Sequence, residues 1–132
     1  MKQKLKLALA IVAAFGLGGA VVQGLHAQAK AAPPIYLVTE IDISNVDAYM
    51  KEYAPKAQAS VKNAGGRLVA ASANVTTIEG QAPAKRVAIQ VWDNMDKMKA
   101  WRSGTEYKDA RKIGDKYAKF RTYAVEAVVT SK

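Results

Sequence analysis

The chain of 132 residues contains no cysteine and a single histidine, His26. Without cysteine it can form no disulfide, and no thiol is available as a nucleophile or metal ligand. His26 lies just behind an apolar N-terminal stretch, and if that stretch is removed the histidine leaves with it. The remaining chain then excludes Cys-His and Ser-His-Asp catalysis. It also lacks the usual ligands of zinc, copper and haem iron, so we expect no metal and no cofactor.

The N-terminal residues 1–29 have the features of an export signal. Three lysines among the first six residues precede the uncharged apolar stretch 7–22, and an A-x-A pattern follows at 27–29. We therefore expect cleavage after Ala29 and a secreted or periplasmic protein. A retained membrane-spanning helix is the alternative, although three glycines within the apolar stretch weaken a helix.

The rest of the chain has the size of one compact domain. A short Ala-Pro tether at 30–34 leads into a single predicted domain at 35–132. No later linker, repeat or low-complexity tract indicates a second domain. We therefore expect the whole function to reside in one small fold.

The first predicted strand is "IYLVTEI" at 35–41, which has apolar side chains on both alternating faces. A long helix follows, because apolar residues recur at helical spacing from Val46 to Ala64 behind a capping arrangement of Ser44 and Asp47. The domain is therefore predicted to begin with a strand that is followed directly by a helix.

Pro55 falls inside that helical pattern, where its ring clashes with the preceding turn. The helix therefore either kinks there or restarts with Pro55 in its first turn. Gly65 and Gly66 supply a left-handed stop.

Two further strands are predicted at 67–80 and 85–92, separated by a turn rich in Gly, Gln and Pro. The first alternates moderately and the second strongly, so we expect them to pair as a hairpin. "FRTYAVEAVV" at 120–129 is predicted as the last strand.

The region between these strands is predicted to hold two helices. Asp93 or Asn94 caps the first, and Ser103 with Glu106 forms a capping box for the second. The element order is then β-α-β-β-α-β with a divided second helical region.

This order predicts an α+β, ferredoxin-like fold, a four-stranded antiparallel sheet with helices on one face. Both faces of the first and last strands are apolar, with Ile35, Leu37 and Ile41 on one face of the first strand and Tyr36 and Val38 on the other, so whichever face the helices leave uncovered would be apolar. Monomeric proteins rarely expose an apolar patch of several hundred Å². We therefore expect a homodimer in which the sheet faces of two copies meet.

Three segments carry a resemblance to a known family: 36–70, 78–101 with a gap, and 106–127. They are "YLVTEIDISNVDAYMKEYAPKAQASVKNAGGRLVA", "IEG" with "AKRVAIQVWDNMDKMKAW", and "EYKDARKIGDKYAKFRTYAVEA". In their order and spacing they resemble the DUF1330 family of dimeric α/β-barrel proteins. The resemblance implies a ferredoxin-like dimer. It implies little about activity, because the family's function is unknown.

Two functions of different classes are therefore considered. The first is a module that binds a small ligand or a partner through a cavity between sheet and helices. The second is a metal- and cofactor-independent enzyme, monooxygenase- or isomerase-like, because related dimeric barrels include such enzymes. A cavity that holds Glu40 or Glu126 beside Arg111 would favour the enzyme.

Arg111 is the first candidate ligand-binding residue, because it lies at the edge of the apolar stripe of its helix, one turn after Tyr107. A guanidinium group there can bind a carboxylate with two hydrogen bonds, or it can pair with Glu106, Asp115 or a strand carboxylate. Tyr107 on the same helix is the second candidate. The other candidates lie at strand ends or within strands, and they are Arg67, Arg86, Trp92, Glu40 and Glu126.

Basic residues outnumber acidic ones by 20 to 11, and residues 97–121 alone contain nine basic and three acidic residues. Four lysines lie opposite the apolar stripe of the last helix, which is typical of a solvated helix face. They are Lys108, Lys112, Lys116 and Lys119. An anionic envelope surface or a small anionic ligand is the candidate partner of this charge. We expect no nucleic-acid binding, because no recognition motif is present.

Overall fold

The computed structural model describes residues 32–129. The predicted export signal at 1–29, its cleavage point after Ala29 and His26 lie outside the described residues. The described elements follow in chain order. They are β1 (Ile35–Ile43), α2 (Val46–Ala48), the π-helical turn η1 (Tyr49–Tyr53), α3 (Ala54–Asn63), β2 (Arg67–Ser72), β3 (Arg86–Trp92), α4 (Met95–Ser103), α5 (Thr105–Gly114) and β4 (Ala118–Glu126).

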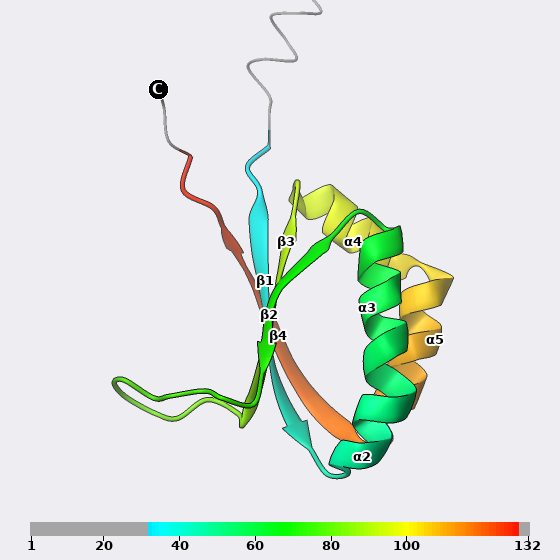
Figure 1. The fold of residues 1–132 in the computed structure, drawn as a ribbon. Coiled ribbons are helices and arrows are strands. Elements are labelled where there is room, and N and C mark those ends of the chain that lie inside the picture. The colour runs from blue at the N-terminus through cyan, green and yellow to red at the C-terminus, as the bar shows by residue number, and fades with distance from the viewer. Residues whose placement is uncertain (1–31, 130–132) are drawn as a thin grey trace, which may run out of the picture. The chain divides into compact units, whose positions relative to one another are not determined.

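The four strands form one antiparallel sheet in the order β2-β3-β1-β4. All the described helices lie on one face of this sheet, and the other face has no layer over it (Figure 1). The α+β, ferredoxin-like fold predicted from the sequence is thereby confirmed.

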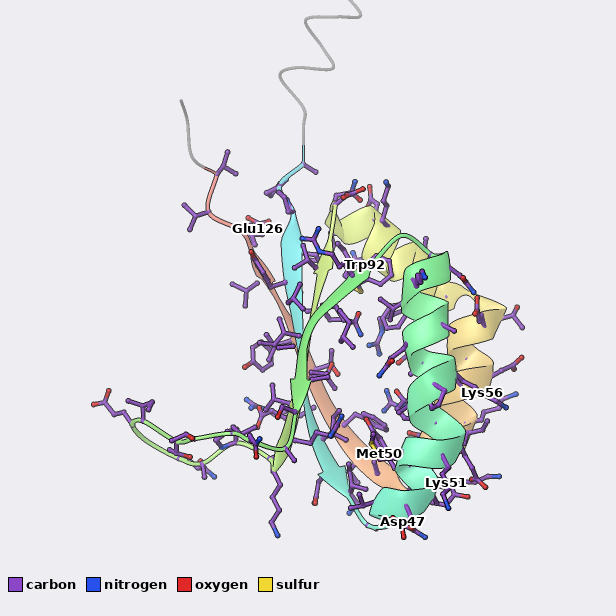
Figure 2. The ribbon with its side chains drawn as sticks, in the orientation of Figure 1. Asp47, Met50, Lys51, Lys56, Trp92 and Glu126 are labelled. Atoms are coloured by element: carbon purple, nitrogen blue, oxygen red, sulfur yellow. The ribbon has the colours of Figure 1, made fainter. Side chains whose placement is uncertain are left out.

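The central strand β1 determines which side chains face the helices. Ile35, Leu37 and Ile41 are buried, whereas Tyr36 between them is 43% exposed. The register sets Ile35 opposite Trp92 of β3, and Trp92 points from β3 toward the helical layer (Figure 2). The alternation predicted for the first strand is therefore present, with one apolar set under the helices and another on the open face.

The first helical region contains a wide, π-helical turn. The region is capped by Asn45, whose side chain accepts a hydrogen bond from the backbone N–H of Ala48. The π-helical turn η1 follows, and α3 starts directly behind it with Pro55 in its first turn. A proline tolerates that position because the first N–H groups of a helix need no intrahelical partner. The helix restarts at Ala54 with Pro55 in its first turn, as one of the two sequence alternatives predicted.

Two predicted helix caps are wrong. Ser44 does not cap the first helix, because its hydroxyl donates to the backbone oxygen of Tyr117 before β4. Ser103 is the last residue of α4, and Gly104 takes the cap position of α5 without a side-chain hydrogen bond. Glu106 instead accepts a hydrogen bond from Asn63 of α3. In both cases a tertiary partner replaces the expected local one.

The strand predicted at 67–80 is shorter than expected, because β2 ends at Ser72. Residues 73–85 form a loop that projects away from the helices, on the side of the open sheet face (Figure 1). The stop at the end of α3 is as predicted, since Gly65 has a φ of +92°. Gly66 has a different role, because a Cβ atom there would lie 2.6 Å from the ring of Trp92.

The apolar core under the helices consists of two clusters. One surrounds Trp92 at one end of the sheet, and the other surrounds Tyr53 and Ile41. On β1 the two clusters are separated by Thr39, which lies between Leu37 and Ile41 on the same face. The core is therefore interrupted by a polar residue at its middle.

None of the helices within residues 32–129 combines the length and the apolar character that a membrane crossing requires. The prediction that four lysines line the last helix is only partly right. Lys108 and Lys112 lie on α5 and are exposed, but α5 ends at Gly114, so the exposed Lys116 lies in the turn that follows and the exposed Lys119 belongs to β4.

Candidate functional site

A cavity of about 70 Å³ lies between the sheet and the helices and opens to solvent. Residues of both core clusters line the cavity, so it lies between the two clusters, beside Thr39. Its polar lining residues come from both layers. They are Thr39, Arg86, Gln90 and Thr122 on the sheet, and Tyr49, Tyr53, Gln58, Arg102, Tyr107 and Arg111 on the helical side.

Two threonines form the polar centre of the sheet side. Thr39 of β1 and Thr122 of β4 are paired in register, and the Thr122 hydroxyl donates to the Thr39 hydroxyl oxygen at 3.2 Å. One hydroxyl hydrogen of the pair remains available, because each hydroxyl carries one donor. The sheet therefore offers a neutral hydrogen-bond donor at the middle of its covered face.

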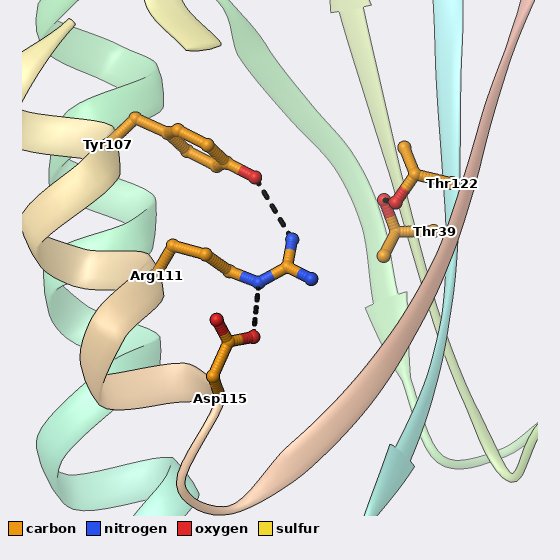
Figure 3. Close-up of polar contacts among 5 residues, drawn as sticks. All are labelled: Thr39, Tyr107, Arg111, Asp115 and Thr122. Atoms are coloured by element: carbon orange, nitrogen blue, oxygen red, sulfur yellow. Dashed lines mark hydrogen bonds and ion pairs between the residues drawn. The ribbon is translucent and has the colours of Figure 1, made fainter. Parts of the chain in front are cut away.

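Arg111 of α5 is held in place on the opposite side. Its Nε donates to Asp115 Oδ1 at 2.7 Å, and its Nη1 donates to the Tyr107 hydroxyl at 3.0 Å. The guanidinium carbon lies 4.1 Å from the ring centroid of Phe120, a cation–π contact. Figure 3 shows the free end of the guanidinium group directed toward Thr39 and Thr122.

Two further arginines line the same cavity, each beside an aromatic ring. Arg86 opens β3 opposite Ile41, and its guanidinium carbon lies 5.9 Å from the ring centroid of Tyr49. Arg102 lies near the end of α4 at 5.0 Å from the ring centroid of Tyr107. The cavity thus carries three positive charges, all contributed by groups that remain protonated in proteins.

The pKa shifts of the lining residues favour their protonated forms. Burial raises the pKa of Tyr53, and the neighbouring Tyr49 raises it further. Burial also raises the pKa of Tyr49, although Arg86 opposes that shift. Burial tends to lower the pKa of Arg111, but its hydrogen bonds to Asp115 and Tyr107 raise the pKa overall. Both tyrosines are therefore neutral donors, and Arg111 is a cation, at every ordinary pH.

No Asp, Glu or His side chain of residues 32–129 lines the cavity. A general base needs a pKa near the working pH, and the lining tyrosines and arginines do not provide one. The described part of the chain also contains no cluster of three or more acidic or histidine side chains that could hold a metal ion. The arrangement can bind and orient an electron-rich molecule, but its own residues supply no proton acceptor.

Gln90 of β3 adds another donor to the sheet side. Its side-chain oxygen accepts a hydrogen bond from the indole N–H of Trp92 at 3.0 Å. The amide nitrogen of Gln90 is then left to serve the cavity that it lines. Trp92 itself is fully buried in the core and does not line the cavity.

The structure brings together three of the sequence-predicted site residues. Arg111, Tyr107 and Arg86 all line the cavity. Arg111 satisfies both of its sequence interpretations, since it pairs with Asp115 and also reaches into the cavity.

The other four candidates lie elsewhere. Arg67 is exposed at the start of β2, Glu126 is exposed at the end of β4, and Trp92 belongs to the core. Glu40 lies on the open face of the sheet, because it alternates with the cavity-lining Thr39. The position of Glu40 could not be predicted from the sequence, because both faces of β1 carry apolar residues and either could have been covered by the helices.

Glu40 is engaged by two partners on that open face. Its carboxylate accepts a hydrogen bond from the backbone N–H of Ala84 at 3.1 Å and pairs with Arg121 of β4. The hydrogen bond from Ala84 lowers the pKa of Glu40, and although burial opposes the shift, Arg121 lowers it further. Glu40 is therefore an ionised partner of Arg121 and has no raised pKa of the kind that a general base requires.

Sequence reasoning missed several lining residues, above all Thr39, Thr122 and Arg102. One signal was available, because Thr39 is the polar residue between Leu37 and Ile41 on an otherwise apolar strand face. Thr122 could only be found from the register between β1 and β4. Arg102 depends on how α4 packs on α5, for which the sequence has no local signal.

The open face of the sheet is more apolar than the covered one at its centre. Val38, Ile89 and Tyr123 lie beside one another in the register of the three strands β3, β1 and β4. These three strands place seven large apolar residues on this face, and Ala70 of β2, opposite Ile89, adds a small one. The seven are Tyr36, Val38, Val87, Ile89, Val91, Tyr123 and Val125.

The sequence matches the profile of the family described as "Domain of unknown function (DUF1330)" over residues 34–128. Among proteins with curated descriptions, none matches the chain.

Several solved structures share the fold. A protein of unknown function from Rhodopseudomonas palustris aligns with a TM-score of 0.62 at 13% identity, covering 74% of this chain and 85% of that one. A cofactor-independent oxygenase from Streptomyces nogalater aligns with a TM-score of 0.56 at 14% identity, covering 75% and 97%. A protein from Bacteroides fragilis, described as dimeric with a ferredoxin-like fold, aligns with a TM-score of 0.51 at 13% identity, covering 71% and 96%. At these identities the similarity shows the fold alone.

Proposed function

The chain belongs to the DUF1330 family, and from that premise we propose that it is a small-ligand binding module that works as a homodimer. The ligand occupies the cavity between sheet and helices, and the two copies meet through their open sheet faces. The observation that carries the proposal is the polar, solvent-open cavity at the middle of an otherwise apolar core.

Such a cavity has a cost in stability that a purely structural core would avoid. Thr39 and Thr122 occupy positions where apolar residues would join the two clusters into one. Buried polar groups are destabilising unless they are hydrogen-bonded, and cavities forfeit packing contacts. A functional requirement accounts for polar groups that gather from seven elements around one space.

The open face supports the homodimer. It carries seven apolar residues, and Tyr123 and Val125 are 44% and 51% exposed in the single chain. A contiguous apolar patch of this kind is typical of an interface. The loop 73–85 projects on the same side and holds Ile78 at 90% exposure, so it is placed to contact a second copy (Figure 1). The dimeric Bacteroides fragilis protein offers a precedent within the fold.

An enzyme without metal or cofactor is the second candidate, favoured by the fold that the chain shares with a cofactor-independent oxygenase. The lining residues of this chain offer arginines, tyrosines and threonines for orienting a substrate, but within residues 32–129 no carboxylate or imidazole for removing a proton. A substrate of such an enzyme would have to lose its proton unaided. Oxygen uptake measured with an electrode in the presence of a bound ligand distinguishes an oxygenase from a binding module, because a binding module consumes none, and NMR of the recovered ligand detects an isomerase by a changed product.

Export from the cytoplasm is part of the proposal, on the strength of the signal-like residues 1–29. Mass spectrometry of the protein isolated from cells tests it. The expected mass is that of a chain beginning at Lys30, and a full-length mass would favour the retained anchor.

A cavity-filling substitution tests the binding function. Ala57 of α3 lines the cavity, whereas Ala59 on the same helix is exposed. Small anionic, neutral and cationic compounds are screened against the wild type by the shifts of its backbone amide NMR signals. Compounds that bind the wild type and Ala59→Leu should fail to bind Ala57→Leu. Binding that survives Ala57→Leu, or a screen without any binder, would contradict the proposal.

A further inference from the structure

We infer that the ligand is a short-chain aliphatic monocarboxylate whose carboxylate group is bound by the free end of Arg111. This inference rests on the proposed function, because it names the ligand class of the same cavity. It is carried by the balance of donors and acceptors, by the fixed position of Arg111 and by the volume of the cavity.

The lining residues offer the ligand more donors than acceptors, and their acceptors are all neutral, namely hydroxyl oxygens and the amide oxygen of Gln58. A guanidinium group has five N–H donors. Two donors of Arg111 are used by Asp115 and Tyr107, so three remain. The threonine pair keeps one hydroxyl hydrogen, and Gln90 has used its oxygen on Trp92 but keeps its amide hydrogens. A molecule that fits this pattern brings oxygen acceptors and negative charge.

The orientation of Arg111 selects the kind of anion. Asp115 occupies Nε, so the guanidinium group is approached from its Nη1 and Nη2 end. That end presents two N–H groups in one plane, which match the two oxygens of a carboxylate. Figure 3 shows this end facing Thr39 and Thr122 across the cavity, so that a bound carboxylate lies between a cation and a hydroxyl donor.

The rest of the lining determines what the carboxylate is attached to. Leu37, Val61 and Leu68 line the cavity together with the ring of Trp101. Inorganic phosphate or sulfate has oxygens on every side, and an oxygen turned toward these side chains would lose its hydration without gaining a partner. A monocarboxylate places its charge at one end, where Arg111 can bind it, and leaves an apolar body to contact these side chains.

The volume limits the size of that body. An engineered apolar cavity of about 150 Å³ holds one benzene molecule. The cavity here is about half as large, at about 70 Å³. Because the cavity opens to solvent, only the carboxylate group and the first carbon atoms need to lie inside it, and a longer body extends through the mouth. Isobutyrate is a suitable probe, because its two methyl groups lie directly behind the carboxylate and its six non-hydrogen atoms place only part of the molecule in the mouth, whereas an aromatic acid would extend much further into solvent.

Titration with matched compounds tests the charge and the shape. Isobutyrate, its neutral amide isobutyramide, inorganic phosphate and benzoate are added separately, and the arginine Nε NMR signals and backbone amide signals are followed. Isobutyrate should shift the Arg111 signal saturably and bind at least about tenfold more tightly than isobutyramide, because hydrogen bonds to charged groups are the stronger ones. Equal binding of isobutyrate and isobutyramide, or tighter binding of phosphate or benzoate, would overturn the inference.

Substitutions test the assignment to Arg111. Arg111→Lys keeps the charge and loses the two-pronged donor, and it should weaken isobutyrate binding at least about tenfold. Arg67→Lys is the matched control, because Arg67 is exposed outside the cavity. Unchanged affinity in Arg111→Lys would refute the role of Arg111. If that variant does not fold, Thr39→Val supplies the test, since it removes the facing hydroxyl without touching Arg111, and unchanged affinity there would equally refute the geometry.

The failure of this inference can be told apart from failure of the proposed function. If a neutral or cationic compound binds and Ala57→Leu abolishes its binding, the cavity is a binding site but not for a carboxylate. If none of the compounds binds, both conclusions fail. If isobutyrate binds and Ala57→Leu leaves its affinity unchanged, the carboxylate lies outside this cavity and the assignment to it is wrong.

Discussion

The two faces of the sheet differ in the polarity of their centres: the covered face is polar there and the open face is apolar, whereas an isolated domain would show the reverse. The face under the helices carries Thr39, Thr122, Arg86 and Gln90 at its centre, around a solvent-open cavity. The face without any described cover carries valines, an isoleucine and two tyrosines at its centre, beside the ion pair of Glu40 and Arg121. A monomer gains by covering apolar surface of this kind. The difference indicates that the covered face is built around a site and that the open face is built for a partner.

The same difference separates stability that belongs to one chain from stability that depends on association. Residues of the covered face contribute to folding at any protein concentration. Residues of the open face contribute fully only when a second copy is bound, because association depends on concentration. Substitutions on the two faces should therefore differ in their concentration dependence as well as in their size.

The largest effect is expected at the most buried position of the covered face. Trp92→Ala should lower the free energy of unfolding by about 3–5 kcal/mol, because it removes a fully buried aromatic side chain from one core cluster. Urea unfolding followed by circular dichroism measures the loss. The loss should be the same at low and at high protein concentration, and a loss below 1 kcal/mol would mean that the cluster is less tightly packed than the structure indicates.

The next effect concerns the open face. Val125→Asp places a charge in the proposed interface and should weaken dimerisation by about 100-fold or more, because a buried unpaired charge costs several kcal/mol. Multi-angle light scattering over a dilution series measures the association. Val46→Asp is the matched control, since Val46 is similarly exposed but lies at the start of a helix, away from the sheet. If both variants dimerise like the wild type, or if the wild type is a monomer throughout, the open face is not the interface.

A smaller effect is expected from removing the polar centre of the covered face. The double substitution of Thr39→Val with Thr122→Val replaces both partners of one hydrogen bond by apolar groups of the same shape. Such a change is nearly neutral or stabilising, so the free energy of unfolding should shift by less than about 1 kcal/mol. Ligand affinity should fall in the same variant. A strongly destabilised variant would show that the hydroxyl pair serves folding, and the comparison of the faces would then need another explanation.

The smallest effect is expected from the ion pair of the open face. The pKa of Glu40 lies below its ordinary value of 4.5, mainly because of the hydrogen bond from Ala84. A carboxyl group with a lowered pKa in the folded state stabilises the protein above its ordinary pKa, and this contribution is lost as the pH falls through the lowered value. The wild type should therefore lose more thermal stability than Glu40→Gln between about pH 5 and pH 3.

Melting temperatures recorded by circular dichroism at several pH values measure this difference. Glu79→Gln, in the exposed loop, serves as the control and should follow the wild type. Parallel pH curves for the wild type and Glu40→Gln would show that the pairing with Ala84 and Arg121 contributes nothing to folding.

Local patterns of the chain predicted most of the secondary structure. The strand that begins at Ile35, the helix restart with Pro55 in its first turn and the left-handed stop at Gly65 all follow from side-chain and backbone preferences of neighbouring residues. The wrong caps at Ser44 and Ser103 have a common cause. In each case a residue of the predicted cap forms a hydrogen bond with a distant segment instead. Ser44 bonds to the backbone of Tyr117, and Glu106 bonds to Asn63.

The candidate site could be predicted only in part. Tyr107 and Arg111 lie one turn apart on one helix, so a helical wheel brings them together. Arg86 was a candidate only because it opens a strand. Thr39, Thr122 and Arg102 come from three different elements, and their convergence depends on strand register and helix packing.

The sequence by itself determined the order of the elements, the fold class and the presence of apolar residues on both faces of the central strands, because these follow from periodicity within short segments. Only the tertiary structure decided which face carries the cavity and that Glu40 and Trp92 stay out of it. Side chains alternate between the two faces of a strand. If the helices packed on the other face, every buried residue of the strand would become exposed and every exposed residue buried. That choice is made by contacts between distant segments, where local sequence carries no information.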